Sequence, residues 1–169
     1  EIMPFDTCYV DVEAFADTVV FNQVEVFYRD LHAMVEGFSD RAQVFRGALS
    51  FSSENLVTLP AAWQWPPLQG RANGQGDLLG PLDSLDFAGT LNVYGFEIDP
   101  VQVRDSDVLL VVNDVLGEPQ ISADIVGRGF TLGGVELGDF TLQGAVSDTG
   151  ARVDTFAATL GDTTVSLRF

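Results

Sequence analysis

His32 is the only histidine in this chain of 169 residues, so any acid–base pair or catalytic triad built on histidine would have to use it. It follows Leu31 in an alternating segment and lies one position off the apolar positions of that segment. No serine stands in the Gly-x-Ser-x-Gly sequence of a nucleophile elbow. We therefore expect a solvent-facing or structural histidine, and we do not expect an enzyme.

Closely spaced carboxylates are the other candidates for chemistry, and they occur at Asp83/Asp86, Glu97/Asp99 and Asp105/Asp107. Glycosidase chemistry needs two carboxylates at a set separation across a cleft, but 25 acidic residues produce sequence pairs by chance. Asp105-Ser106-Asp107 in a loop would suit calcium better, although no EF-hand loop is present. One histidine and one cysteine disfavour zinc. We expect no metal and no cofactor.

A run of glycines, Gly70-x-x-x-Gly74-x-Gly76-x-x-x-Gly80, superficially resembles a phosphate-binding loop. It lacks the lysine of a Walker motif, and no helical pattern follows it. Strand bends and tight turns explain these glycines better than a nucleotide site.

Strands must position any site, because one five-residue pattern recurs three times in the chain. The copies are Phe45-x-Gly47-x-Leu49, Phe87-x-Gly89-x-Leu91 and Leu142-x-Gly144-x-Val146. Their strict alternation is the period of a strand with one side buried. The central glycine allows a bend or a close approach by neighbouring groups.

The turn signals between apolar segments predict an all-β fold of repeated antiparallel strands. We expect an elongated curved sheet, either an open groove or a sandwich, with at most one short helix. Residues 1–59 would form an N-terminal strand group with a helical turn within 13–22, and residues 70–169 a glycine-punctuated β-repeat region. A Trp/Pro-rich crossover at 60–69 would join them into one continuous structure.

The crossover contains Pro60, Pro66 and Pro67, which cannot lie in an interior strand. Its two indoles, Trp63 and Trp65, would plug one edge of the core or clamp the mouth of an apolar groove. A third and weaker alternative is that the segment acts as a proline-rich peptide ligand.

The formal net charge of −17 repels nucleic acid and anionic bilayers, so we do not expect either as a partner. All eight basic residues are arginine. We expect Cys8, the single cysteine, to be a buried thiol on a strand. The longest apolar run, residues 108–112, is far too short for a spanning helix. No secretory signal is visible, and the chain reads as a piece of a longer protein.

The alternation of apolar and polar residues predicts one apolar face that runs through the repeats. The same alternation fits a closed core or the lining of an open groove, so it does not distinguish between them. In the second case we expect the face to hold acyl chains. The predicted groove residues are Phe45, Leu49, Phe51, Phe87, Leu91, Val93, Leu142, Val146, Trp63 and Trp65.

The glycine and aliphatic spacing of residues 74–91, which ends in Leu85-x-Phe87-x-Gly89-x-Leu91, resembles the recurring unit of the TamB/AsmA-like proteins. Residues 123–146 resemble the same unit, and residues 24–51 are similar to AsmA-type strand pairs. The resemblance implies a β-taco, an elongated and strongly curved sheet with an apolar interior. It also implies an inner-membrane anchor in the full-length protein, a periplasmic location and a role in outer-membrane biogenesis. The partners would be phospholipid acyl chains and outer-membrane assembly proteins.

The chain departs from that family in its short length, its missing anchor and its Trp/Pro crossover. The main alternative is a structural or adhesive β-domain with a closed core. A small outer-membrane barrel fits less well, because three tyrosines and two tryptophans are few for two aromatic girdles. A carboxylate-based hydrolase comes last. An exposed edge strand would allow self-association in any of these cases.

Overall fold

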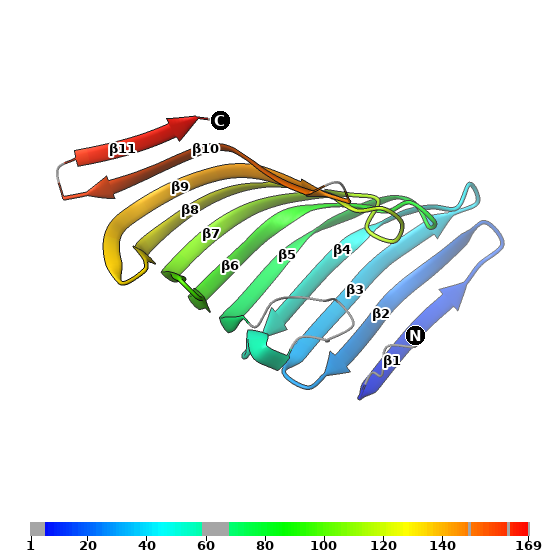
Figure 1. Cartoon of the computed structure of the whole chain (residues 1–169). Helices are drawn as coiled ribbons and strands as arrows, with labels where there is room; N and C mark the ends of the chain where they lie inside the picture. Colours follow the sequence, from blue (N-terminus) through cyan, green and yellow to red (C-terminus); the bar gives the residue numbers. More distant parts are fainter. Residues whose placement is uncertain (1–5, 59–67, 149, 162, 169) are drawn as a thin grey trace.

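The computed structural model describes residues 6–58, 68–148, 150–161 and 163–168, which form one open antiparallel sheet (Figure 1). Eleven strands are found in these residues, and their order in the sheet is their order in the chain. The strands are β1 Thr7–Ala14, β2 Thr18–Tyr28, β3 Leu31–Asp40, β4 Val44–Ser53, β5 Gln69–Pro81, β6 Asp86–Ile98, β7 Val101–Asn113, β8 Gln120–Leu132, β9 Val135–Ser147, β10 Gly150–Leu160 and β11 Thr163–Arg168. The same described residues contain one 3₁₀ turn, η1, which spans Leu56–Thr58. The prediction of an all-β fold with repeated antiparallel strands is confirmed.

Each strand contacts mainly its neighbours in the sheet, as expected of a meander. Predicted turn sequences connect several of the hairpins, among them Asp99-Pro100 and Gly133-Gly134. β4 and β5 pair directly from Val44↔Pro81 to Ser53↔Ala72, although the Trp/Pro-rich segment lies between them in the chain. The strands before and after that segment therefore belong to one sheet. Among the described residues no second sheet or helical layer covers either face, so the sandwich alternative does not apply.

The register separates the side chains into two faces. We call one the apolar face; among its members are Phe45, Leu49, Phe51, Leu78, Phe87, Leu91, Val108, Leu110, Ile125 and Leu142. The opposite face, which we call the polar face, includes Arg46, Asp77, Asn92, Asp107, Asp124 and Gln143. The alternation in the sequence thus becomes one continuous apolar surface that crosses the sheet.

Phenylalanine rings of the apolar face lie over glycines. A Cβ added at Gly47 would meet the Glu36 carbonyl oxygen at 2.1 Å and the Phe45 ring at 2.7 Å, and one added at Gly89 would meet the Gln75 carbonyl oxygen at 2.3 Å and the Phe87 ring at 2.6 Å. In the repeated Phe-x-Gly pattern, therefore, the glycine makes room both for the backbone of the neighbouring strand and for the ring two residues before it. Close approach, the second of the two predicted reasons for this glycine, is confirmed in these copies.

Two clusters form the most buried part of this face. The first centres on Phe45, Leu78 and Phe87, and the partly buried Leu85 and Val115 pack against it from two turns. The Val115 N–H donates to the Leu85 carbonyl at 2.7 Å, which ties these turns together. The second cluster centres on Val103, Phe140 and Ala158.

Figure 1 shows that the sheet is curved, and distances between side chains indicate the face toward which it bends. Strands two steps apart are separated by about 9.6 Å in a flat sheet. Yet the ring centroids of Phe21 on β2 and Phe45 on β4 lie 5.5 Å apart, and those of Phe130 on β8 and Phe156 on β10 lie 5.6 Å apart. Side chains converge on the apolar face, as they do in a sheet that bends toward it.

Two expectations for the N-terminal region are wrong. The helical turn within 13–22 is absent, because β1 ends at Ala14 and β2 begins at Thr18. The run Thr18-Val19-Val20-Phe21 favours a strand through its β-branched and aromatic side chains. Cys8, expected to be buried, is exposed, because β1 is an edge strand with a neighbour on one side only.

Candidate functional site

The apolar face brings together the predicted groove residues that the structure describes. Register places them in cross-strand rows, and part of one row is Phe51↔Gly74↔Leu91↔Val108↔Ile125↔Leu142. Phe45, Leu49 and Phe87 meet in the first cluster, and Leu142 packs against the second. Val93 continues the face beyond Leu91, and Val146 lies at its opposite end. Trp63 and Trp65 lie outside the described residues.

Burial along this face is incomplete, as a single-layer sheet requires. Phe45 and Phe87 are 3% and 4% exposed, whereas Leu49, Phe51, Leu91, Val93 and Leu142 are only half-buried. Val146 is 46% exposed. No described apolar side chain is completely buried. The described part of the molecule therefore offers apolar area that a further layer, or a ligand, would remove from water.

The apolar face offers mainly apolar contacts, although the buried Ser106 also lies on it. The described residues contain no group of three or more His, Cys, Asp or Glu side chains that could hold a metal ion.

His32 projects from the polar face and stacks on Phe27, with ring centroids 4.4 Å apart and an interplanar angle of 8°. Its Nε2 lies 3.5 Å from a Glu25 carboxylate oxygen. The sequence left open a solvent-facing or a structural histidine, and these contacts favour the structural one.

Residues 105–107 do not form the loop that a calcium site at this position would require. Asp105, Ser106 and Asp107 lie in the middle of β7, where successive side chains point to opposite faces. Ser106 is buried on the apolar face, and Asp105 is paired with two arginines on the polar face. A strand with this alternation cannot bring the three side chains to one ion.

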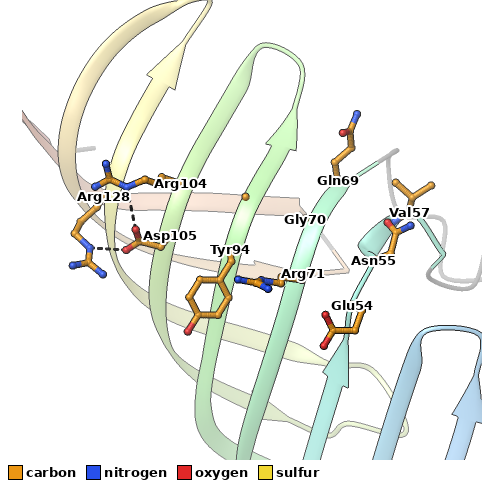
Figure 2. A pocket seen from close by; sticks show the side chains of 11 residues that line it. Glu54, Asn55, Val57, Gln69, Gly70, Arg71, Tyr94, Arg104, Asp105 and Arg128 are labelled. Carbon is orange, nitrogen blue, oxygen red and sulfur yellow. Dashed lines mark hydrogen bonds and ion pairs between the residues drawn. The ribbon is translucent and has the colours of Figure 1, made fainter.

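The polar face carries a hollow of about 750 Å³ that the sequence analysis did not find (Figure 2). Its floor is formed by β5 to β8, and one side is formed by the chain between β4 and η1. The charged and aromatic side chains that line it are Glu54, Arg71, Tyr94, Arg104, Asp105 and Arg128. These residues come from four strands and a turn, so they do not form a local motif that could be recognised in the sequence.

Asp105 joins two of these arginines. Arg128 Nε donates to one carboxylate oxygen at 2.5 Å, and Arg104 Nε donates to the other at 3.2 Å. Chiefly through the Arg128 hydrogen bond, these guanidinium groups lower the pKa of Asp105 below its usual value, although desolvation opposes the shift. Because the lowered pKa belongs to the folded state, the stabilisation is present above the ordinary aspartate range and is lost only at lower pH. The carboxylate thus remains charged at neutral pH.

Comparisons with known proteins add no relative: no family model, no curated protein and no solved structure matches this chain. The part of the chain that the structure describes holds no helix of the length and apolarity needed to cross a bilayer.

Proposed function

We propose that the apolar face is a groove segment that holds phospholipid acyl chains, in a TamB/AsmA-like protein of the bacterial periplasm. The observation that supports this proposal is the open apolar face: a curved sheet with half-buried aliphatic side chains and no second layer among the described residues. The repeat resemblance supports the same assignment.

The driving force is the burial of apolar surface. Each acyl methylene that leaves water contributes about 0.8 kcal/mol. Rows of aliphatic side chains across many strands would let a chain of ten or more carbons lie along the sheet. Such contacts select for apolar length and not for headgroup chemistry, as a conduit for mixed phospholipids requires.

In this role the domain would contribute to outer-membrane biogenesis and to the translocation and assembly of outer-membrane components. The full-length protein would be anchored in the inner membrane, and outer-membrane assembly proteins would be its partners. The reaction is transfer without covalent chemistry, so no catalytic residue is required.

Native mass spectrometry of protein purified without detergent tests the proposal. We expect adducts of phospholipid mass in the wild-type protein and their loss in Leu91→Asp, because the charge would lie within an apolar row that crosses the sheet. Leu142→Asp places the same charge on β9 and should give the same loss. Leu109→Asp is the matched control, since Leu109 is 55% exposed on the polar face of β7.

Circular dichroism must show that each variant keeps its strand content before its adducts are compared. A clean protein mass after incubation with phospholipid vesicles, or adducts that persist in folded Leu91→Asp and Leu142→Asp, would overturn the groove. The alternative of a non-catalytic structural or adhesive β-domain would then take its place.

A further inference from the structure

A row of polar side chains crosses four strands at the hollow on the polar face. Register aligns Arg71 on β5 with Tyr94 on β6, Tyr94 with Asp105 on β7, and Asp105 with Arg128 on β8. Arg71 stacks on Tyr94, with its guanidinium carbon 5.1 Å from the ring centroid. Figure 2 shows Tyr94 between the Arg71 side chain and the group formed by Arg104, Asp105 and Arg128.

Arg104 joins this row because three neighbouring strands share a kink. Two residues, instead of one, separate consecutive apolar-face positions at Val93/Phe96, Val103/Ser106 and Gly127/Phe130. Gly95 and Gly129 lie at the kink with positive φ angles of 60° and 67°. The side chains of Arg104 and its chain neighbour Asp105 therefore both line the hollow. In a regular strand, adjacent side chains point to opposite faces, so only one of them could do so.

The guanidinium groups keep unused donors. Arg104 and Arg128 both use Nε on Asp105, and among the described residues no hydrogen-bond partner is found for their terminal Nη groups. Their side chains are 68% and 63% exposed. Asp105 thus holds two forked, solvent-accessible donors beside each other, and Arg71 supplies a third from the other side of Tyr94.

The charge of the hollow contrasts with that of the chain. Three of the eight arginines line it against two carboxylates, Glu54 and Asp105, whereas the whole chain carries a net charge of −17. Positive side chains thus outnumber negative ones in the lining, which favours a small anion there, although Asp107 and Asp139 also interact electrostatically with Arg128. An anionic membrane surface would meet the repulsion of the whole molecule, so a soluble ligand fits the hollow better.

We propose that this hollow binds a small soluble phosphate ester through Arg71, Arg104 and Arg128. The forked donors of three arginines match the several oxygens of a phosphate group, and its second negative charge favours it over a carboxylate. Asn55 and Gln69 line the same hollow and offer amide groups to the remainder of the ligand. The site lies on the opposite face from the acyl-chain groove and does not depend on it.

Titration calorimetry with glycerol 3-phosphate and, separately, with inorganic phosphate tests this site. We expect saturable binding that weakens with added salt, whereas acetate at the same concentration binds far more weakly. Arg71→Gln should weaken binding by roughly tenfold, since a charge-assisted hydrogen bond is lost. Arg71 stacks on Tyr94, whereas the side-chain hydrogen bonds of Asp105 come from Arg104 and Arg128, so replacement of Arg71 leaves the Asp105 group intact.

Arg46→Gln is the matched control, because it removes the same charge from an exposed position on β4 outside the hollow. Its affinity should remain within about twofold of wild type, since a surface charge at a distance is screened. Leu91→Asp on the apolar face should also bind phosphate normally, which separates this site from the lipid groove.

Three outcomes would overturn the proposal: no saturable binding of either phosphate compound, equal losses in Arg71→Gln and Arg46→Gln, or unchanged affinity in a folded Arg71→Gln. Binding confined to vesicles of phosphatidylglycerol would assign the arginines to a membrane headgroup and would equally contradict a soluble ligand. Arg104→Gln provides a second variant, and unchanged affinity in it would remove Arg104 from the site.

Discussion

Phenylalanine and glycine act as pairs in this sheet. The ring of Phe140 on β9 lies over Gly127 on β8, and these two residues are also register partners. Glycine in a strand is normally unfavourable, by about 0.5–1 kcal/mol relative to alanine. Here it allows a flat ring to lie directly on the neighbouring strand, so the packed ring compensates for the weak strand residue.

Gly127→Ala should destabilise the fold, against the usual direction for glycine in a strand. The added Cβ would meet Phe140 ring atoms at 2.2 and 2.6 Å, and the three nearest atoms all belong to that ring. Overpacking of this kind costs about 1–3 kcal/mol. Urea unfolding followed by circular dichroism measures the change.

The double variant Gly127→Ala/Phe140→Leu identifies the cause. Because the ring alone produces the clash, its removal should make the double variant more stable than the sum of the two single changes predicts. Strict additivity within about 0.5 kcal/mol would show that the ring and the glycine are not coupled.

At the scale of the strands, the kink across β6, β7 and β8 is the feature that builds the arginine-lined hollow. Gly129 on β8 has a positive φ of 67°, and a Cβ there would meet the Arg104 Cβ at 2.8 Å. The conformation of one strand thus determines where a side chain of the next strand lies.

Gly129→Ala should therefore be worse than an equivalent change elsewhere. Gly134, in the turn between β8 and β9, also has a positive φ, 80°, but a Cβ there would have nothing within 4 Å. Both alanines carry a left-handed backbone cost of about 1–2 kcal/mol. Only Gly129→Ala adds the contact with Arg104, so its thermal midpoint should be lower than that of Gly134→Ala.

The same pair of variants reports on the hollow. Gly129→Ala should weaken phosphate binding because it displaces Arg104, whereas Gly134→Ala should not. Equal stability of the two variants, or equal phosphate affinity, would show that Arg104 does not depend on the kink.

The strands and the apolar face were predictable from the sequence because both are local. Alternation fixes which residues share a face, and pairs such as Gly133-Gly134 mark the turns. The row Arg71–Tyr94–Asp105–Arg128 was not predictable, because it depends on the register of four strands and on a kink that shifts the alternation. The same limit explains Cys8, whose exposure follows from the place of β1 at the edge of the sheet and not from its own apolar neighbours.

At the scale of the whole molecule, one layer of strands separates two environments. Apolar contacts lie on one face, and the arginine-lined hollow lies on the other, so changes on either face should be functionally independent. The layer also has two edges, β1 and β11, each of which pairs with one neighbouring strand. Every residue of both strands is exposed.

Such edges present unpaired backbone groups that accept a further strand. Val10 on β1 and Val165 on β11 are 58% and 50% exposed, and register places both on the apolar face. An added strand at either edge would extend that face. We therefore expect the isolated chain to associate edge to edge as its concentration rises.

The double variant Val10→Lys/Val165→Lys should reduce this association, because an inward-facing charge on an edge strand opposes pairing with another chain. Sedimentation velocity over a hundredfold range of concentration measures the effect as a return to the monomer. Leu109→Lys makes the same kind of substitution on β7, whose two neighbours, β6 and β8, already satisfy its edges, and it should leave the association unchanged. If Leu109→Lys disrupts the oligomer as strongly as the edge variant does, the contact runs through the faces of the sheet, and the edges are not its cause.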